Sequence, residues 1–156
     1  MLKLSWVIIM YEKIKSEIVN AMKEKNTLKL QTLRGIKGDA DMEHINKKVE
    51  INDDLMLTVI SRGIKTRKES ILEFEKGNRD DLIAKTNQEI ELLQKFLPEQ
   101  LSSEEIAKIL DEVFAKVNPT SEKEMGLIMK EVTPLVKGKA DMKEVSNMIK
   151  EKLKNL

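Results

Sequence analysis

Two groups of basic residues could bind phosphate groups, because ammonium and guanidinium groups neutralise phosphates in a salt-sensitive interaction. One group surrounds a predicted turn near the C-terminus, and the other occupies consecutive turns of a predicted helix. The members are Lys130, Lys137, Lys139 and Lys143 in the first group, and Arg62, Lys65, Arg67 and Lys68 in the second. Aromatic residues make up only 3% of the chain, so stacking on single-stranded bases is not expected. The groups favour the backbone of a folded RNA, and solvated helix faces are the alternative interpretation.

No set of residues forms a recognisable catalytic or metal site. His44 is the only histidine, so it cannot make a His-based metal site, and no motif places it beside a serine nucleophile. The acidic pairs Asp53–Asp54 and Asp80–Asp81 lie where helices are predicted to begin, and helix N-termini favour negative charge. No Gly-rich phosphate loop is present. We therefore predict that the chain by itself is not an enzyme and binds no cofactor and no metal.

The composition is that of a helical protein with an aliphatic core. Hydrophobic residues are 40% of the 156 residues and charged residues are 35%, with nine methionines but only three phenylalanines. The formal net charge is +1, so the chain is not a globally basic nucleic-acid binder. The absence of cysteine excludes disulfides and thiolate metal sites. These features predict a cytoplasmic protein.

Residues 1–9 form an apolar-rich opening that is too short to span a membrane. Met10 is followed at once by the first predicted helix. One interpretation is that residues 1–9 arise from an early start codon or were added to the natural chain. The other is a native extension that lays Trp6 and Ile8 on the core. No membrane association is predicted.

Apolar residues at three- and four-residue steps predict helices throughout, and no segment alternates with the period of a strand. The first four helices are predicted over residues 11–25, 28–46, 52–76 and 79–96. Gly35 and Gly38 lie inside the second helix, where each glycine costs about 1 kcal/mol relative to alanine. They indicate a weakened helix or a close helix–helix contact. Arg67 lies on the apolar stripe of the third helix, so we predict that a carboxylate from the second or fourth helix pairs with it.

Pro98 is predicted to end the fourth helix, because proline lacks a backbone N–H and restricts the residue before it. We place a domain boundary there. The N-terminal domain, a bundle of about four helices, is predicted over residues 10–97, and a compact three-helix domain over residues 98–156. Ser102 and Glu105 have the spacing of a capping box at the start of the fifth helix. The predicted fold class is all-α.

The last two predicted helices form a hairpin over Glu124–Leu153, with apolar residues on one face of each helix. They are Met125, Ile128, Met129, Val132 and Leu135 in the first helix, and Met142, Val145, Met148, Ile149 and Leu153 in the second. Gly138 can adopt the left-handed conformation that ends the first of these helices. Asp141 can cap the second, with Glu144 completing a capping box. A phosphate could then approach the bare backbone at Gly138 and the N-terminus of the last helix.

The hairpin contains M-G-x-x-M-K, K-G-K-A-D and V-S-x-x-I-K in that order, starting at Met125. This series resembles the C-terminal signature of the GatB/YqeY family. The resemblance extends upstream to F-L-P-E-Q-L at Phe96–Leu101 and to the segment Arg62–Leu82, which contains R-K-E-S-I-L-E-F-E-K-G-N-R-D-D-L. It covers the chain from about Tyr11 to the C-terminus.

The resemblance implies a helical C-terminal domain similar to the tail domain of the GatB chain of the tRNA-dependent glutamyl/aspartyl amidotransferase, which embraces the tRNA body. The matching positions are Gly126, Met129, Lys130, Gly138, Lys139 and Ala140. The chain has no counterpart of the catalytic cradle, of its metal site or of the amidase subunit. Where the amidotransferase tail has Asn-Pro after G-K-A, this chain has Asp141-Met142. The family usually has larger residues or alanine at Gly35 and Gly38.

The residues and the resemblance together predict a non-catalytic accessory module that binds tRNA, or a tRNA-dependent amidotransferase or aminoacylation complex. A protein–protein adaptor without RNA contact is the first alternative, with the methionine-lined hairpin as its docking surface. An auxiliary component of a glutamine-dependent carbon–nitrogen ligase is the second. The sequence leaves the oligomeric state open.

Overall fold

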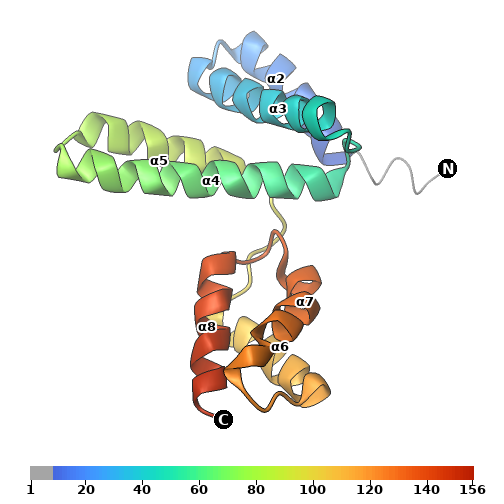
Figure 1. Ribbon diagram of the computed structural model, residues 1–156. Helices are drawn as coiled ribbons and strands as arrows, with labels where there is room; N and C mark the ends of the chain where they lie inside the picture. The colour runs from blue at the N-terminus through green and yellow to red at the C-terminus, as the bar shows by residue number, and fades with distance from the viewer. Residues whose placement is uncertain (1–8) are drawn as a thin grey trace. The chain divides into compact units, whose positions relative to one another are not determined.

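The computed structural model describes residues 9–156, and within this range every regular element is a helix (Figure 1). The helices are α2 (Ile9–Glu24), α3 (Thr27–Lys47), α4 (Asp53–Lys76), α5 (Asp80–Gln94), α6 (Ser103–Val117), the short 3-10 helix η1 (Glu122–Glu124), α7 (Met125–Val136) and α8 (Met142–Lys154). The predicted all-α fold class is confirmed. The prediction for Trp6 and Ile8 lies outside the described residues. Among the described helices, none is both long and apolar enough to cross a membrane.

The chain divides between Leu97 and Pro98 into two compact units. In the N-terminal unit, α2 packs along α3, and α4 and α5 form a long hairpin (Figure 1). Helices of this length gain most of their stability by burying an apolar face, and the four faces meet in one core. Its most deeply buried side chains are Ile14 and Ala21 of α2, Leu33, Ile36 and Ala40 of α3, Met56, Val59 and Ile60 of α4, and Leu93 of α5.

In the C-terminal unit, α6, α7 and α8 surround a second core (Figure 1). The buried side chains are Ile106, Leu110, Val113 and Phe114 of α6, Ile128, Val132 and Val136 of α7, and Val145, Ile149 and Leu153 of α8. The predicted capping box begins this unit's first helix. The Glu105 N–H donates to Ser102 Oγ at 3.1 Å, and the Ser102 N–H donates to Glu105 Oε2 at 3.2 Å.

The solvent-facing side of α7 carries more apolar residues than the sequence pattern predicted. Leu135 was expected in the core, but its side chain is 48% exposed and Val136 is buried instead. Consecutive residues of an α-helix point about 100° apart, so Leu135 lies at the edge of the outer face. Leu127 is 54% exposed on that face.

The glycine that allows a close helix contact is Gly63 of α4 and not Gly35 or Gly38. A Cβ atom at Gly63 would lie 2.8 Å from Ile36 Cδ1 and 3.6 Å from Leu93 Cδ1. Gly35 and Gly38 face solvent, and a Cβ atom at either position would have nothing within 4 Å. They break neither the continuity of α3 nor its packing.

Candidate nucleic-acid interface

The turn between α7 and α8 has a defined shape because its backbone is hydrogen-bonded to α7. The Lys137 N–H donates to the Thr133 carbonyl at 3.0 Å, and the Lys139 N–H donates to the Val136 carbonyl at 2.9 Å. Gly138 has a φ angle of 74°, in the left-handed region that favours glycine, as predicted. A side chain at this position would strain the backbone.

The segment that follows Pro98 holds the same turn from the other side. The Gln100 side-chain amide donates to the Gly138 carbonyl at 2.9 Å and to the Pro98 carbonyl at 2.9 Å. The Leu101 N–H donates to the Lys139 carbonyl at 2.7 Å. The motifs F-L-P-E-Q-L and K-G-K-A-D are therefore one structural feature, although they lie far apart in the sequence.

Four lysines project from or beside this turn, and we call Lys130, Lys137, Lys139 and Lys143 the lysine cluster. Lys130 is exposed on α7, Lys139 in the turn and Lys143 in the first turn of α8, whereas Lys137 is half-buried. Within residues 9–156, the side chains of Lys130, Lys139 and Lys143 pair with no carboxylate. Their charges are therefore accessible to an anion from solvent.

The backbone beside the lysine cluster is less accessible than predicted. The Lys143 N–H is taken by Asp141 Oδ1 at 2.9 Å, so the predicted cap is confirmed. Glu144 does not complete a capping box, because it accepts a hydrogen bond from Ser103 Oγ at 3.1 Å. The N–H groups of Lys137 and Lys139 already donate to carbonyls of α7. The N–H groups of Lys137, Lys139 and Lys143 are therefore not open to a phosphate. Contact of a phosphate with the backbone at Gly138 or with the N-terminus of α8 stays a prediction, and the lysine ammonium groups are the more accessible partners.

The other residues of the C-terminal signature divide into packing and outward-facing positions. Met129 and Ala140 are half-buried against the core of this unit. Gly126 faces solvent, with nothing within 4 Å of the place where a Cβ atom would lie. Gly126 and Lys130 are four residues apart, so they share the outer face of α7.

The second predicted basic group lies on α4, in the N-terminal unit. Arg62 Nη1 donates to Glu43 Oε1 at 2.9 Å, and Lys47 Nζ lies 3.0 Å from the other oxygen of that carboxylate. The hydrogen bond from Arg62, with that from Lys47, holds the pKa of Glu43 below its ordinary value. Lys65 is exposed.

Arg67 joins α4 to α5. Its Nε donates to Glu89 Oε2 at 3.1 Å and its Nη1 donates to the Gly63 carbonyl at 3.1 Å. The prediction that a carboxylate from the second or fourth predicted helix pairs with Arg67 is confirmed, because Glu89 lies on α5, the fourth predicted helix. The Arg67 and Glu89 side chains are 24% and 21% exposed, so water still reaches the pair.

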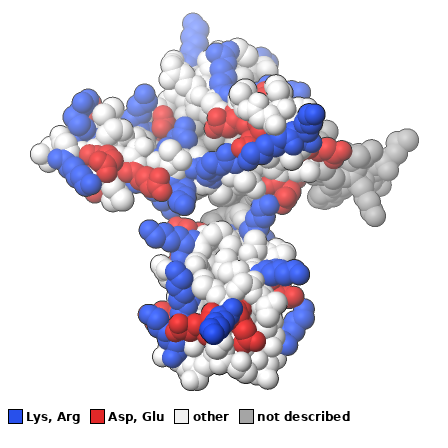
Figure 2. Space-filling view, viewed as in Figure 1, with Lys and Arg blue, Asp and Glu red and all other residues white. Residues whose placement is uncertain are grey.

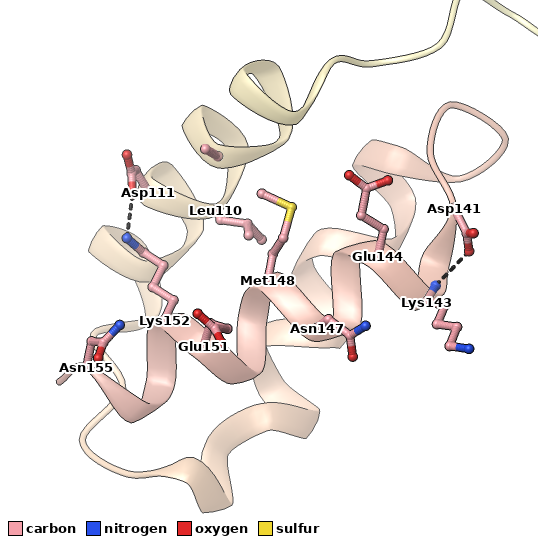
Figure 3. A pocket seen from close by; sticks show the side chains of 11 residues that line it. Leu110, Asp111, Asp141, Lys143, Glu144, Asn147, Met148, Glu151, Lys152 and Asn155 are labelled. Carbon is pink, nitrogen blue, oxygen red and sulfur yellow. Dashed lines mark hydrogen bonds and ion pairs between the residues drawn. The ribbon is translucent and has the colours of Figure 1, made fainter.

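A groove of about 800 Å³ lies between α6 and α8 (Figure 3). Leu110 and Met148 supply its apolar part, and Met148 points toward α6. Its charged lining residues are Asp111, Asp141, Glu144 and Glu151, with Lys143 and Lys152. Lys152 is paired with Asp111. The carboxylates outnumber the lysines, so the groove favours a cationic ligand over a phosphate.

Acidic and basic side chains are interspersed elsewhere as well. Figure 2 shows both signs mixed on the visible face of each unit. In the part of the chain that the structure describes, no group of histidine and carboxylate side chains is arranged to hold a metal ion. The lysine cluster is thus a local feature of a surface with nearly balanced charge.

Comparison with known proteins decides the family. A model of the Yqey-like proteins matches residues 11–153. The chain belongs to the YqeY-like family. The match includes both motifs that meet at the α7–α8 turn and the helices of both units.

Relatives of the chain are known in fungi under the name altered inheritance of mitochondria protein 41, mitochondrial. The protein of Pyrenophora tritici-repentis is 26% identical over 146 residues, which cover 92% of this chain and 80% of that protein. The protein of Vanderwaltozyma polyspora is 29% identical over 151 residues, which cover 92% of this chain and 81% of that protein. The protein of Kluyveromyces lactis is 33% identical over 84 residues, which cover 53% of this chain and 45% of that protein. The similarity to the first two proteins therefore extends over nearly the whole chain.

Proposed function

We propose that this YqeY-like protein is a non-catalytic accessory module that binds structured RNA, with tRNA as the expected ligand, through the lysine cluster. The observation that carries the proposal is the fixed α7–α8 turn. Gln100 and Leu101 donate hydrogen bonds to its carbonyls at Gly138 and Lys139. The lysines therefore project from a fixed backbone. Three of the four lysines have no carboxylate partner in residues 9–156.

The chemistry of the cluster suits phosphates of a folded RNA. Lysine side chains contact phosphates as point charges and carry little base specificity. Four contacts predict that the logarithm of the binding constant falls with the logarithm of the salt concentration with a slope of about −3 to −4. Carboxylates in the neighbouring groove and at Asp141 keep the affinity modest.

The test is tRNA binding measured by fluorescence anisotropy across a salt series. The variant replaces Lys137 and Lys139 by Glu, and we expect loss of detectable binding with unchanged helicity by circular dichroism. The matched control replaces Lys123 and Lys154 by Glu, because Lys123 lies in η1 before α7 and Lys154 is the last residue of α8, both away from the turn. The control should retain most of the affinity. Equal binding by the two variants, or no salt-sensitive binding by the natural sequence, would overturn the proposal.

A protein–protein adaptor is the second candidate, and the groove between α6 and α8 favours it. Together with the exposed Leu127 and Leu135 of α7, it supplies apolar surface that the C-terminal unit does not use itself. This function would replace RNA binding if the salt series shows no affinity. Membership of an amidotransferase complex, as a partner without its own chemistry, belongs to the same candidate.

The compartment is also a proposal. The fungal relatives carry the word mitochondrial in their names, whereas the sequence of this chain predicts the cytoplasm. Both the cytoplasm and the mitochondrial interior contain tRNA, so the proposed ligand is the same in either. Fractionation of cells that express the tagged protein would distinguish them.

A further inference from the structure

The face of α3 that points away from the core carries an uncharged row of residues. Its positions alternate three and four residues apart, which is the heptad spacing of helices that pair with another helix. The members of this α3 row are Gln31, Gly35, Gly38, Met42 and Ile45. The outer face of a surface helix is ordinarily polar, and 35% of this chain is charged. The α3 row is therefore an unusual solvent-facing surface.

The two halves of the α3 row differ in size. At one end, Gly35 and Gly38 have open space where Cβ atoms would lie. At the other end, the Met42 side chain is 55% exposed and the Ile45 side chain is 66% exposed. Neither feature has a use inside the protomer, since each glycine costs the helix about 1 kcal/mol relative to alanine.

An antiparallel pair of two such rows is self-complementary. When a two-fold axis passes near residue 40, Gly35 of one copy lies opposite Ile45 of the other, and Gly38 lies opposite Met42. Each large side chain then meets a bare stretch of backbone. A parallel pair would instead set glycine against glycine and methionine against methionine. Two-fold symmetry with the same patch on both protomers is the commonest form of protein self-association.

We propose that α3 pairs antiparallel with α3 of a second copy of this chain, with Met42 and Ile45 of each protomer filling the space over Gly38 and Gly35 of the other. Met22 of α2 extends the apolar contact at the glycine end. Its side chain is 46% exposed, and its sulfur accepts a hydrogen bond from Arg34 Nη2 at 3.5 Å. One helix pair buries less area than a standard interface, so we expect a weak, transient dimer.

The dimer uses the N-terminal unit only and none of the lysine cluster. RNA binding and self-association can therefore fail separately. Sedimentation velocity of the full chain over a concentration series, without RNA, measures the dimer directly. We expect the sedimentation coefficient of the natural sequence to rise with concentration toward that of a dimer, and a monomer at all soluble concentrations would overturn the proposal.

Gly38→Met is the decisive variant. It should raise the thermal midpoint of the monomer, because methionine favours a helix more than glycine and the space beside the monomer is open. It should also weaken the dimer at least tenfold, because two side chains then compete for one space. Adding Met42→Ala to Gly38→Met should restore much of the dimer. Undiminished self-association of Gly38→Met would overturn the proposal even if the natural sequence dimerises.

Ile45→Glu tests the opposite half of the row and should also give a monomer, since the charge would be buried at the contact. The matched control is Leu72→Glu on α4, where the leucine is 58% exposed but lies outside the α3 row. It should leave the dimer intact. Equal loss of self-association in the two variants would place the contact elsewhere and overturn the proposal.

Discussion

Basic residues in the two units lie in different surroundings. On α4, Arg62 is hydrogen-bonded to Glu43, and Arg67 is held by Glu89 and the Gly63 carbonyl. In the lysine cluster of the C-terminal unit, three of the four side chains have no carboxylate partner within residues 9–156. The comparison shows that similar runs of positive charge serve different ends. The α4 arginines join helices to one another, whereas Lys130, Lys139 and Lys143 pair with no carboxylate within residues 9–156.

The largest expected effect comes from breaking the Arg67 contacts. Arg67→Ala removes two hydrogen bonds and leaves Glu89 without its partner, so we expect the N-terminal unit to lose about 2 kcal/mol of unfolding free energy. The loss is smaller than for a fully buried pair, because water reaches both side chains. Urea denaturation followed by circular dichroism measures it.

Lys139→Ala is the matched variant in the C-terminal unit. It should change stability by less than about 0.5 kcal/mol, as surface substitutions usually do. If Arg67→Ala leaves the denaturation midpoint unchanged, or if Lys139→Ala lowers it as much, the distinction between the two groups of basic residues is wrong.

A middle-sized effect is expected at Gln100, which holds the turn that carries the lysines. Gln100→Ala removes the hydrogen bond to the carbonyl of the buried Gly138 and should cost the C-terminal unit about 1 kcal/mol. It should also weaken tRNA binding a few-fold, because the lysines then project from a looser turn. The neighbouring Glu99→Ala, at an exposed position, serves as the control. Unaltered stability in Gln100→Ala would show that the turn holds its shape without this contact.

The smallest expected effect is the pH dependence of the Arg62–Glu43 pair. Arg62, followed by Lys47, lowers the pKa of Glu43 in the folded protein. A carboxylate with a lowered pKa contributes stability that is present above its ordinary pKa and is lost as the pH falls through the folded value. The natural protein should therefore be more stable than Glu43→Gln at pH 7, and the difference should shrink below the ordinary glutamate pKa of 4.5. A difference that stays constant with pH would show that Glu43 acts by packing alone.

Local patterns in the sequence were enough to predict the helices and several of their ends. The capping box of Ser102 and Glu105, the left-handed Gly138 and the cap at Asp141 each depend on residues close in the chain. The same is true of the all-α class, which follows from the spacing of apolar residues. Even so, the predicted buried face of α7 was wrong at its end, where Val136 is buried in place of Leu135. Where neighbouring residues are all apolar, their spacing defines the buried face only approximately.

Features that depend on distant residues could not be predicted in the same way. A close helix contact was one interpretation of Gly35 and Gly38, whereas it is Gly63 that makes such a contact, with Ile36. The role of Gln100 was hidden because its acceptor at Gly138 lies 38 residues further along the chain. Its only signal was that both motifs belong to the family resemblance. Likewise, nothing local indicated that Ser103 would take Glu144 away from its cap.

The link between the 98–101 segment and the α7–α8 turn has a consequence for how the protein is made. During synthesis the donors at Gln100 and Leu101 leave the ribosome before the acceptors at Gly138 and Lys139 exist. The turn can be completed only when a loop of nearly forty residues has closed, which carries an entropic cost. A fragment that begins at Ser103 would contain every helix of the C-terminal unit and would still lack both donors. The structural boundary of this unit therefore lies before its first helix, at the segment that holds the α7–α8 turn.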